Sequence, residues 1–511
     1  MKLAHTYLKT PFKLTFLALI SLLLLAACAT SGPSTQSAEA PASQWYSPVP
    51  AGASAQKNST LPHQGTLVEL NQWWQNLGDP LLVELISSTQ AVSPTITAAA
   101  SRLQQARSTS VAAGAALLPS AGLAASSTRS MNPLSVPALS TVSQVGVQAR
   151  WELDLFGGNR AARDAALARV DGSTAMWHEA RVSVAAEVAT TYLNFRTCEQ
   201  LLAVAQADLA SRSETSRLTG LTADAGFTAP ANAALARASA AQGQNTLSLQ
   251  NMQCEMAIKV LVALTAFPEP VLRKKLDVAG VFLDKSATKL IANSENIQAP
   301  ALPLVPSVPA QLLLQRPDVF AAERELAAAS GDVGSAQAAR YPRLSLSGSI
   351  AAARLVTGGV SVDGNTWSIG PLSLTLPLFD GGRLAANVDA AQARYDDAAA
   401  SYRAKVRSAV REVEEALLNL QSTAERNDAA KIATEGYAAA FNASEARYKS
   451  GLGSLADLED TRRTALAAKT SLLNLQRERS TAWIALYRAT GGGWQQTTPS
   501  TSEVSQVLVN K

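Results

Sequence analysis

The sequence contains one long pattern twice, and this duplication restricts the chain to folds built from two similar halves. One set of landmarks recurs 223 residues apart, and after a two-residue shift a second set recurs 225 residues apart. The first set is Leu118-Pro119-Ser120 with Tyr341-Pro342-Arg343 and Phe156-Gly157-Gly158 with Phe379-Asp380-Gly381; the second includes Asp164 with Asp389, Glu187 with Glu412, Asn194 with Asn419 and Gly226 with Gly451. The constant offset predicts the same succession of elements in residues 66–267 and 309–494.

Each repeat is expected to begin with a helix and to end with a long helical hairpin. The first helices are predicted at about 80–116 and 309–339. The helix from Leu384 to Tyr448 would be ~95 Å long at 1.5 Å per residue, and a heptad stripe on its return arm predicts packing against a neighbouring helix. Residues 268–308 and the polar tail 495–511 fit neither pattern and are expected to form a small side structure.

Two strand-like segments lie between the helices of each repeat. They are predicted at about 119–131 and 142–156, and at about 342–355 and 366–379, with Gly-, Pro- and Ser-rich loops at 131–140 and 356–365. Apolar and polar residues alternate along them, as in VGVQARWELDL, which begins at Val145. In the last segment the alternation slips at Pro371, which predicts a bulge.

The alternation raises the question of what covers the apolar face. A soluble sheet with one buried face would alternate in the same way, but the helices predicted here are too long to cover four strands. In a bilayer only a closed barrel satisfies strand backbone groups, and an eight-stranded barrel is filled by side chains whereas larger barrels leave a channel. The fold expected is therefore mainly α with a transmembrane β-barrel shared by at least three chains. Arg150, Glu152 and Asp154 are expected to face its wet lumen.

The N-terminus predicts export. Residues 1–27 carry basic residues, an apolar run and small residues before Cys28, and Leu25-Ala26-Ala27-Cys28 resembles the bacterial lipobox, in which the cysteine is lipidated. Ordinary cleavage at the small residues is the alternative. The Ser-, Ala- and Pro-rich residues 28–65 are expected to form a flexible tether. The formal charge of +4 falls to +1 once three lysines leave with the signal, so no basic excess suggests a nucleic-acid partner.

The remaining histidines and cysteines suggest no catalytic site. His63 and His178 have neither metal-ligand nor triad spacing, and no phosphate-binding loop is present, so neither an enzyme nor a cofactor is expected. Cys198 and Cys254 each lie 28 residues from Gly226, on opposite arms of the first hairpin. An exported hairpin folded at this glycine would bring them to the same height, which predicts a disulfide; two buried thiols at unmatched rotations are the alternative.

Three motifs resemble the outer-membrane efflux (TolC-like) family, in particular the NodT-type lipoprotein branch that serves resistance-nodulation-division pumps. They are RPDVFAAERELAAASGDVGSAQAARYPRLSLSG (316–348), ARYKSGLGSLADLED (446–460) and ALYRATGGGW (485–494). The resemblance implies a homotrimer in the outer membrane, with a 12-stranded barrel continued by a 12-helix periplasmic tunnel. It also implies a periplasmic adaptor and an inner-membrane pump as partners, with no cofactor in the channel. The protein would then be the exit channel of the pump, through which small molecules such as drugs and toxic organics leave the cell.

The resemblance also assigns roles near the hairpin tips. The family's adaptors dock at tips that correspond to Gly226, Phe227, Gly451 and Leu452. Asp457 and Asp460 resemble the carboxylate ring at the tunnel mouth, and Tyr448 matches a residue that holds neighbouring hairpins closed. In the family this tyrosine usually pairs with an aspartate, and Asn232 occupies the position of that aspartate here. The contact that holds the hairpins closed is therefore expected to be weaker or differently built. The alternatives are a plain turn at each tip and a solvated helix face at the aspartates.

Two other functions remain open from the sequence. A protein of the same architecture could be the exit duct of a type I protein secretion system. A protein of another class, a periplasmic coiled-coil lipoprotein that does not span the membrane, would explain the heptads and Cys28 but not the paired strands.

Overall fold

The computed structural model describes residues 32–33, 45–47, 74, 79–132, 136–277 and 316–493 of the chain. Cys28, the predicted signal, most of the predicted tether and the tail 495–511 lie outside these residues. The chain forms two compact units, one built mainly from Ser101–Thr174 and Ala321–Ala404 and the other from Ala40–Ala100, Ala175–Phe320 and Lys405–Lys511. Within the described residues, no helix combines the length and the apolar character needed to cross a membrane.

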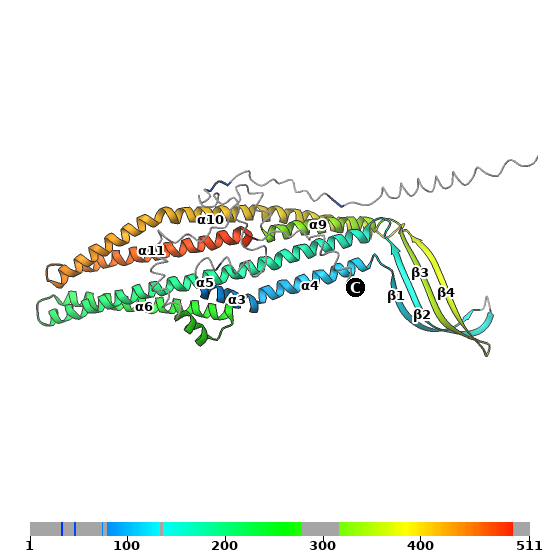
Figure 1. Cartoon of the computed structure of the whole chain (residues 1–511), viewed down its shortest axis with the longest axis horizontal. Coiled ribbons are helices and arrows are strands. Elements are labelled where there is room, and N and C mark those ends of the chain that lie inside the picture. Colours follow the sequence, from blue (N-terminus) through cyan, green and yellow to red (C-terminus); the bar gives the residue numbers. More distant parts are fainter. Residues whose placement is uncertain are drawn as a thin grey trace, which may run out of the picture. The chain divides into compact units, whose positions relative to one another are not determined.

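The first unit contains one antiparallel sheet of four strands in the order β1-β2-β3-β4 (Figure 1). The strands are β1 (Ser120–Asn132), β2 (Val136–Leu153), β3 (Arg343–Thr357) and β4 (Val360–Thr375). The central pair joins the two repeats, because β2 of the first pairs with β3 of the second from Leu153↔Leu344 to Ser140↔Thr357. Strands β1 and β4 are the edges of the sheet described here.

Two predicted loops are wrong, because the strands run well into both. In the structure β1 ends at Asn132 and β2 begins at Val136, while β3 ends at Thr357 and β4 begins at Val360, so the strands extend into the predicted loops at 131–140 and 356–365. The turn between β3 and β4 is Gly358-Gly359 with φ of 55° and 85°, and positive φ at both central residues is typical of a type I′ hairpin. The bulge predicted at Pro371 is confirmed, because the β3–β4 register shifts between Leu346 and Gly348, opposite Gly370-Pro371.

The two faces of the sheet differ sharply in polarity. One row across all four strands pairs Leu123, Val147, Ile350 and Trp367, whose side chains are 77%, 50%, 70% and 74% exposed. The next row points to the other face, because successive side chains alternate. That row is Gly122, Gln148, Ser349 and Ser368, and the two serine hydroxyls are 3.0 Å apart. The sheet thus presents an uncovered apolar face and a polar face.

Two helical hairpins repeat the same dimensions. Helices α5 (Gly158–Asp224) and α10 (Arg383–Lys449) each contain 67 residues, and their return helices are α6 (Pro230–Thr265) and α11 (Leu455–Ala489). The proline-free sequence permits this length, and tertiary packing stabilises it. Helix α9 (Pro317–Ala338) precedes the strands of the second repeat.

The first helix of repeat 1 is not continuous, contrary to the prediction at 80–116. It is divided into α3 (Pro80–Val92) and α4 (Pro94–Ala115). Ser93 between them is extended with ψ of 121°, since a residue before proline avoids the helical region. Its hydroxyl accepts a 3.4 Å hydrogen bond from the N–H of Ile96, which caps the second helix.

The core of the second unit lies where α3, α5, α6 and α11 meet. Trp74 is fully buried and packs edge-on against Trp483 and Tyr487, with ring centroids 5.9 and 5.0 Å apart. Residues 269–277, at the start of the predicted linker, are helical, and Leu272 and Leu276 join this core. Cys198 on α5 and Cys254 on α6 form a disulfide with their Cα atoms 5.5 Å apart.

Candidate functional site

Both hairpin tips are closed by the same backbone motif. Gly226 and Gly451 have φ of 81° and 76°, a conformation that glycine adopts without strain. The N–H of Phe227 donates to the carbonyl of Thr222 at 2.8 Å, and in the second hairpin the N–H of Leu452 donates to Arg447 at 2.8 Å. These are the bonds of a Schellman motif, so each glycine is required by the turn itself.

The residue after each glycine leaves an apolar side chain in solvent. Phe227 is 86% exposed and Leu452 is 75% exposed. In many Schellman motifs an apolar residue at this position packs back on the helix. Here the C3 positions are the polar Thr222 and Arg447, and Phe227 and Leu452 stay largely exposed. Exposed apolar residues at a tip are typical of a surface that binds a partner.

Asp457 and Asp460 lie on the exposed first turns of α11. Ser454 caps this helix by accepting a 3.0 Å hydrogen bond from the N–H of Asp457. Carboxylates are favoured at this helix end by the helix dipole. Asp460 also pairs with Arg463 at 2.6 Å, and both side chains are more than half exposed. Within one chain, the geometry is thus that of a solvated, partly neutralised acidic turn.

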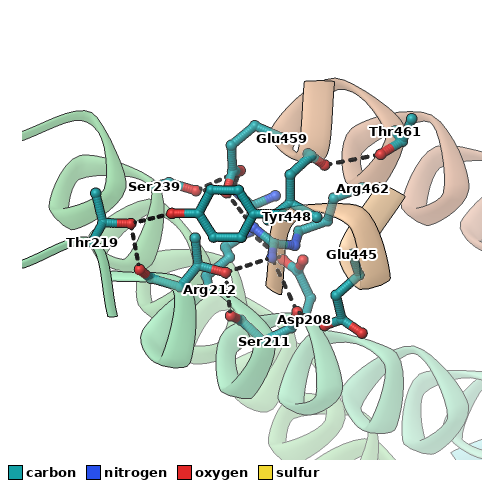
Figure 2. Close-up of polar contacts among 12 residues, drawn as sticks. Asp208, Ser211, Arg212, Thr219, Ser239, Glu445, Tyr448, Glu459, Thr461 and Arg462 are labelled. Carbon is teal, nitrogen blue, oxygen red and sulfur yellow. Dashed lines mark hydrogen bonds and ion pairs between the residues drawn. The ribbon is translucent and has the colours of Figure 1, made fainter. Parts of the chain in front are cut away.

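Tyr448 is bonded to a residue that the sequence did not suggest. Its hydroxyl lies 2.7 Å from that of Thr219 on α5 (Figure 2), whereas Asn232 is exposed in the first turn of α6. This pair of hydroxyl groups joins the first hairpin to the end of α10. Threonine was missed because nothing in the sequence links positions 219 and 448.

A buried ionic cluster lies beside this contact, and sequence reasoning missed it as well. It consists of two arginines and two carboxylates, Asp208, Arg212, Glu459 and Arg462, with side chains 7%, 12%, 18% and 3% exposed. Arg212 bonds Asp208 at 2.8 Å and Glu459 at 3.4 Å, and Glu459 also pairs closely with Arg462. The cluster is balanced in charge, as burial of ions requires.

Hydroxyl groups on the first hairpin complete the cluster (Figure 2). Arg462 donates to Ser211 at 3.1 Å and to Thr215 at 2.9 Å, and Ser239 bonds both Arg212 and Glu459. Arg462 also lies over the ring of Phe441, 5.6 Å from its centroid. The ionic cluster thus connects α11 of the second hairpin to α5 and α6 of the first. Its signal in the sequence, an arginine in a heptad helix, is too common to identify it.

The predicted lumen residues divide into two groups. Arg150 pairs with Ser120 and Ser347, and Glu152 pairs with Ser345, so both lie in rows of the polar face. The prediction for Asp154 is wrong. The strand ends at Leu153, and the Asp154 carboxylate accepts the N–H groups of Asn159 and Arg160 at 3.1 and 2.8 Å, which caps α5. Alternation alone could not show where the strand ended.

Aromatic residues lie at the end of the sheet nearest the helices. The indole N–H of Trp151 donates to the carbonyl of Leu117 at 3.0 Å, and Phe156 stacks on Tyr341 with centroids 4.8 Å apart. Phe379 is 93% exposed. Among the described residues, no group of three or more His, Cys, Asp or Glu side chains is arranged to hold a metal.

Long paired hairpins, combined with a sheet that has one uncovered apolar face, define a class of protein, the channels of bacterial outer membranes. The sequence model of the outer membrane efflux protein family matches residues 85–266 and 308–492. The chain belongs to this family, and it is an outer-membrane component of efflux.

Curated relatives match along nearly the whole chain. The pyoverdine export outer membrane protein OpmQ of Pseudomonas putida is 30% identical over 94% of this chain and 97% of its own length. OprJ of Pseudomonas aeruginosa is 29% identical, covering 94% and 96%. Nodulation protein T of Rhizobium leguminosarum bv. viciae is 28% identical, covering 84% and 85%.

Solved structures share the fold. VceC of Vibrio cholerae is 26% identical and aligns with a TM-score of 0.70 over 85% of this chain and 100% of its own. The CmeC channel of Campylobacter jejuni is 22% identical, and its TM-score of 0.76 covers 94% and 98%. These alignments confirm the TolC-like architecture.

Proposed function

We propose that three copies of this chain join their sheets into one twelve-stranded barrel in the outer membrane, continued by a tunnel of twelve helices. The observation that carries this proposal is the exposed row Leu123, Val147, Ile350 and Trp367. Lipid would cover this face, while the serine-rich face lines the lumen with Arg150 and Glu152. Four strands leave two edges with unpaired backbone groups, and pairing β4 of one copy with β1 of the next would remove them.

The height of the apolar face approaches the apolar band of about 25 Å that outer-membrane barrels present to lipid. On β2 this face runs from Leu153 to Val145, a length of about 26 Å along the strand. If the strand is tilted by about 40° from the membrane normal, this length spans roughly 20 Å of the membrane's thickness. Beyond it the same face becomes polar, with the row Ser127, Ser143, Arg354 and Asp363, in which the arginine and the aspartate are 2.7 Å apart. Trp151, Phe156 and Phe379 at the other end would form an interfacial aromatic girdle.

The channel would be the exit duct of a tripartite pump for small molecules. The exposed Phe227 and Leu452 support docking of a periplasmic adaptor, which would connect the tunnel to an inner-membrane pump of the resistance-nodulation-division type. Relatives named as outer membrane proteins of a solvent efflux pump and of a toluene efflux pump favour small organic molecules over the protein substrates of type I secretion. In the trimer, Asp457 and Asp460 would form a ring of carboxylates at the tunnel mouth.

A lipid anchor at Cys28 would complete the attachment to the outer membrane. Gly32 and Pro33 lie against α9, where the hydroxyl of Ser330 donates to the carbonyl of Pro33 at 2.6 Å. Because Gly32 is four positions after Cys28, the anchor would lie within roughly 14 Å of this contact. The segment that follows the lipidated cysteine would therefore be held against α9 at Pro33. A wholly flexible tether would make no such contact.

Reconstitution in planar bilayers tests the proposal. The purified protein is expected to form stepwise, ion-conducting pores whose activity co-purifies with a trimer that resists dissociation in detergent. A protein that stays monomeric and leaves bilayers unpermeabilised would contradict it. The non-spanning coiled-coil alternative predicts this second result.

A further inference from the structure

The N-terminal segment is bound to the body of the protein at two places, first on α9 and then on α10. At the first, the hydroxyl of Ser330 donates to the carbonyl of Pro33. Gly32 lies so close to α9 there that a Cβ built on it would overlap the carbonyl oxygen of Ser330. At the second, residues 45–47 lie on α10 beside Glu414.

The carboxylate of Glu414 binds two successive backbone N–H groups. One of its oxygens accepts from the N–H of Tyr46 and the other from the N–H of Ser47, each at 2.7 Å. The hydroxyl of Ser47 donates in turn to the main-chain carbonyl of Glu414 at 3.2 Å. The chain bends at Tyr46 and Ser47, and successive N–H groups at a bend form a concave site for an anion. Hydrogen bonds to an ionised acceptor are also roughly twice as strong as neutral ones.

The pKa of Glu414 is consistent with this arrangement. Burial alone would raise it, but the hydrogen bonds from Ser47 and Tyr46 outweigh burial and hold the pKa below its usual value. The carboxylate is therefore charged at neutral pH, and the segment that it binds stabilises the charge.

Two neighbouring side chains of the segment differ in their burial. Trp45 is 9% exposed, whereas the side chain of Tyr46 is 85% exposed. A tryptophan buried to this extent removes a large apolar area from water. The segment is thus held both by one apolar side chain and by its backbone.

The duplication indicates that Glu414 serves this segment and not the packing that the two repeats share. At the offset of 225 residues its equivalent on α5 is Ala189, which is fully buried in the hydrophobic core. The long helices therefore do not require a carboxylate at this position.

We infer that α10 carries a peptide-binding site, built on Glu414, whose ligand is the protein's own N-terminal segment. The carboxylate recognises the backbone of a bend, and the buried Trp45 adds side-chain specificity. The site holds the segment without help from a lipid, so the residues that follow Cys28 have a binding function besides connecting the anchor to the first repeat. The inference depends neither on the proposed trimer nor on lipidation.

Digestion of the full-length protein with chymotrypsin tests the inference. This protease cleaves after aromatic residues, and cleavage after Tyr46 requires the segment to leave its site. When release is fast compared with cleavage, the cleavage rate follows the released fraction. Mass spectrometry identifies the fragments, and cleavage after the buried Tyr192 in the same digest reports general unfolding.

Glu414→Gln should release the segment. The amide keeps the shape of the side chain but turns an NH₂ group toward one of the two N–H donors. Cleavage after Tyr46 is expected to accelerate about tenfold or more, with cleavage after Tyr192 unchanged. Glu415→Gln is the matched control, because Glu415 is more than half exposed and pairs with Arg411 at 2.8 Å. Equal rates after Tyr46 in the two variants, or an equal acceleration after Tyr192, would overturn the inference.

A second pair of variants tests the contribution of the buried indole. Trp45→Ala should also accelerate cleavage after Tyr46, because the apolar contact is lost. Trp45→Phe should retain most of the protection, since it keeps an aromatic ring. If Trp45→Ala is protected as well as the wild type, the segment is not held at this site and the inference fails.

Discussion

Glu179 shows how burial alters the behaviour of a single side chain in this protein. Burial, together with the nearby Asp318, raises its pKa to about 7, although a 2.9 Å hydrogen bond from Ser183 and the charges of Arg316 and Arg488 oppose the shift. A carboxyl whose pKa is raised in the folded state binds a proton more tightly there than in the unfolded chain. Folding is therefore favoured below the unfolded pKa and loses this contribution as the pH rises to about 7.

We predict that Glu179→Gln reduces the pH dependence of stability. Between pH 5 and pH 8 the wild-type protein should lose about 1–3 kcal/mol more stability than the variant, because the buried carboxylate must ionise. Thermal unfolding at the two pH values measures this difference, with the exposed Glu435→Gln as the control. If the stability of Glu179→Gln and that of Glu435→Gln depend on pH in the same way, Glu179 ionises freely in the folded protein.

A second prediction at this scale concerns the acidic turn of α11. Replacing Asp457 and Asp460 together by asparagine should lower the preference of the pore for cations, because the carboxylates would attract cations to the tunnel mouth. Arg463 would also lose its partner and add positive charge. The reversal potential in a salt gradient reports the preference. No change in it would place these aspartates on an ordinary solvated helix face.

At the scale of elements, the sequence predicted which elements form and in what order, but not all of their ends. Alternation and the missing prolines were sufficient for the strands and the long helices, because both signals extend over many residues. The Gly358-Gly359 turn, the break at Ser93-Pro94 and the end of β2 before Asp154 depend on one or two residues each. The ionic cluster joins residues 247 positions apart, such as Arg212 and Glu459, and only packing of the hairpins reveals it.

The two faces of the sheet predict opposite responses to the same substitution. Ile350→Asp places a charge on the apolar face and should cost about 1–3 kcal/mol of stability in the membrane. Ser349→Asp, one residue earlier on the polar face, should be tolerated. The amount of heat-resistant trimer in outer-membrane fractions measures both. Equal loss in the two variants would contradict the assignment of lipid and lumen faces.

The disulfide of the first hairpin gives a prediction for the helices. Cys198→Ser with Cys254→Ser should lower stability by about 2–4 kcal/mol, since the cross-link closes a long loop between α5 and α6. Thermal unfolding compares the variant with the wild type. Mass spectrometry of the unreduced wild-type protein should find no free thiol at either cysteine; two free thiols there would remove the basis of this prediction.

At the scale of the whole molecule, one chain is expected to supply only part of the barrel wall. The internal duplication gives the chain two similar halves, and symmetry between copies would supply the rest. The described residues of one chain form four strands and two helical hairpins, and in the proposed assembly the rest of the wall would come from other copies. The family and its solved relatives establish the architecture, while the apolar row and the open sheet edges explain physically why a single copy would be incomplete in a bilayer.

Native mass spectrometry of the detergent-solubilised protein shows how many copies form the barrel. We expect a particle of three chains, with dissociation to monomers only under conditions that also unfold the sheet. A particle with the mass of one chain, folded and stable in detergent, would rule out a shared barrel, because its apolar face and both strand edges would then need no partner.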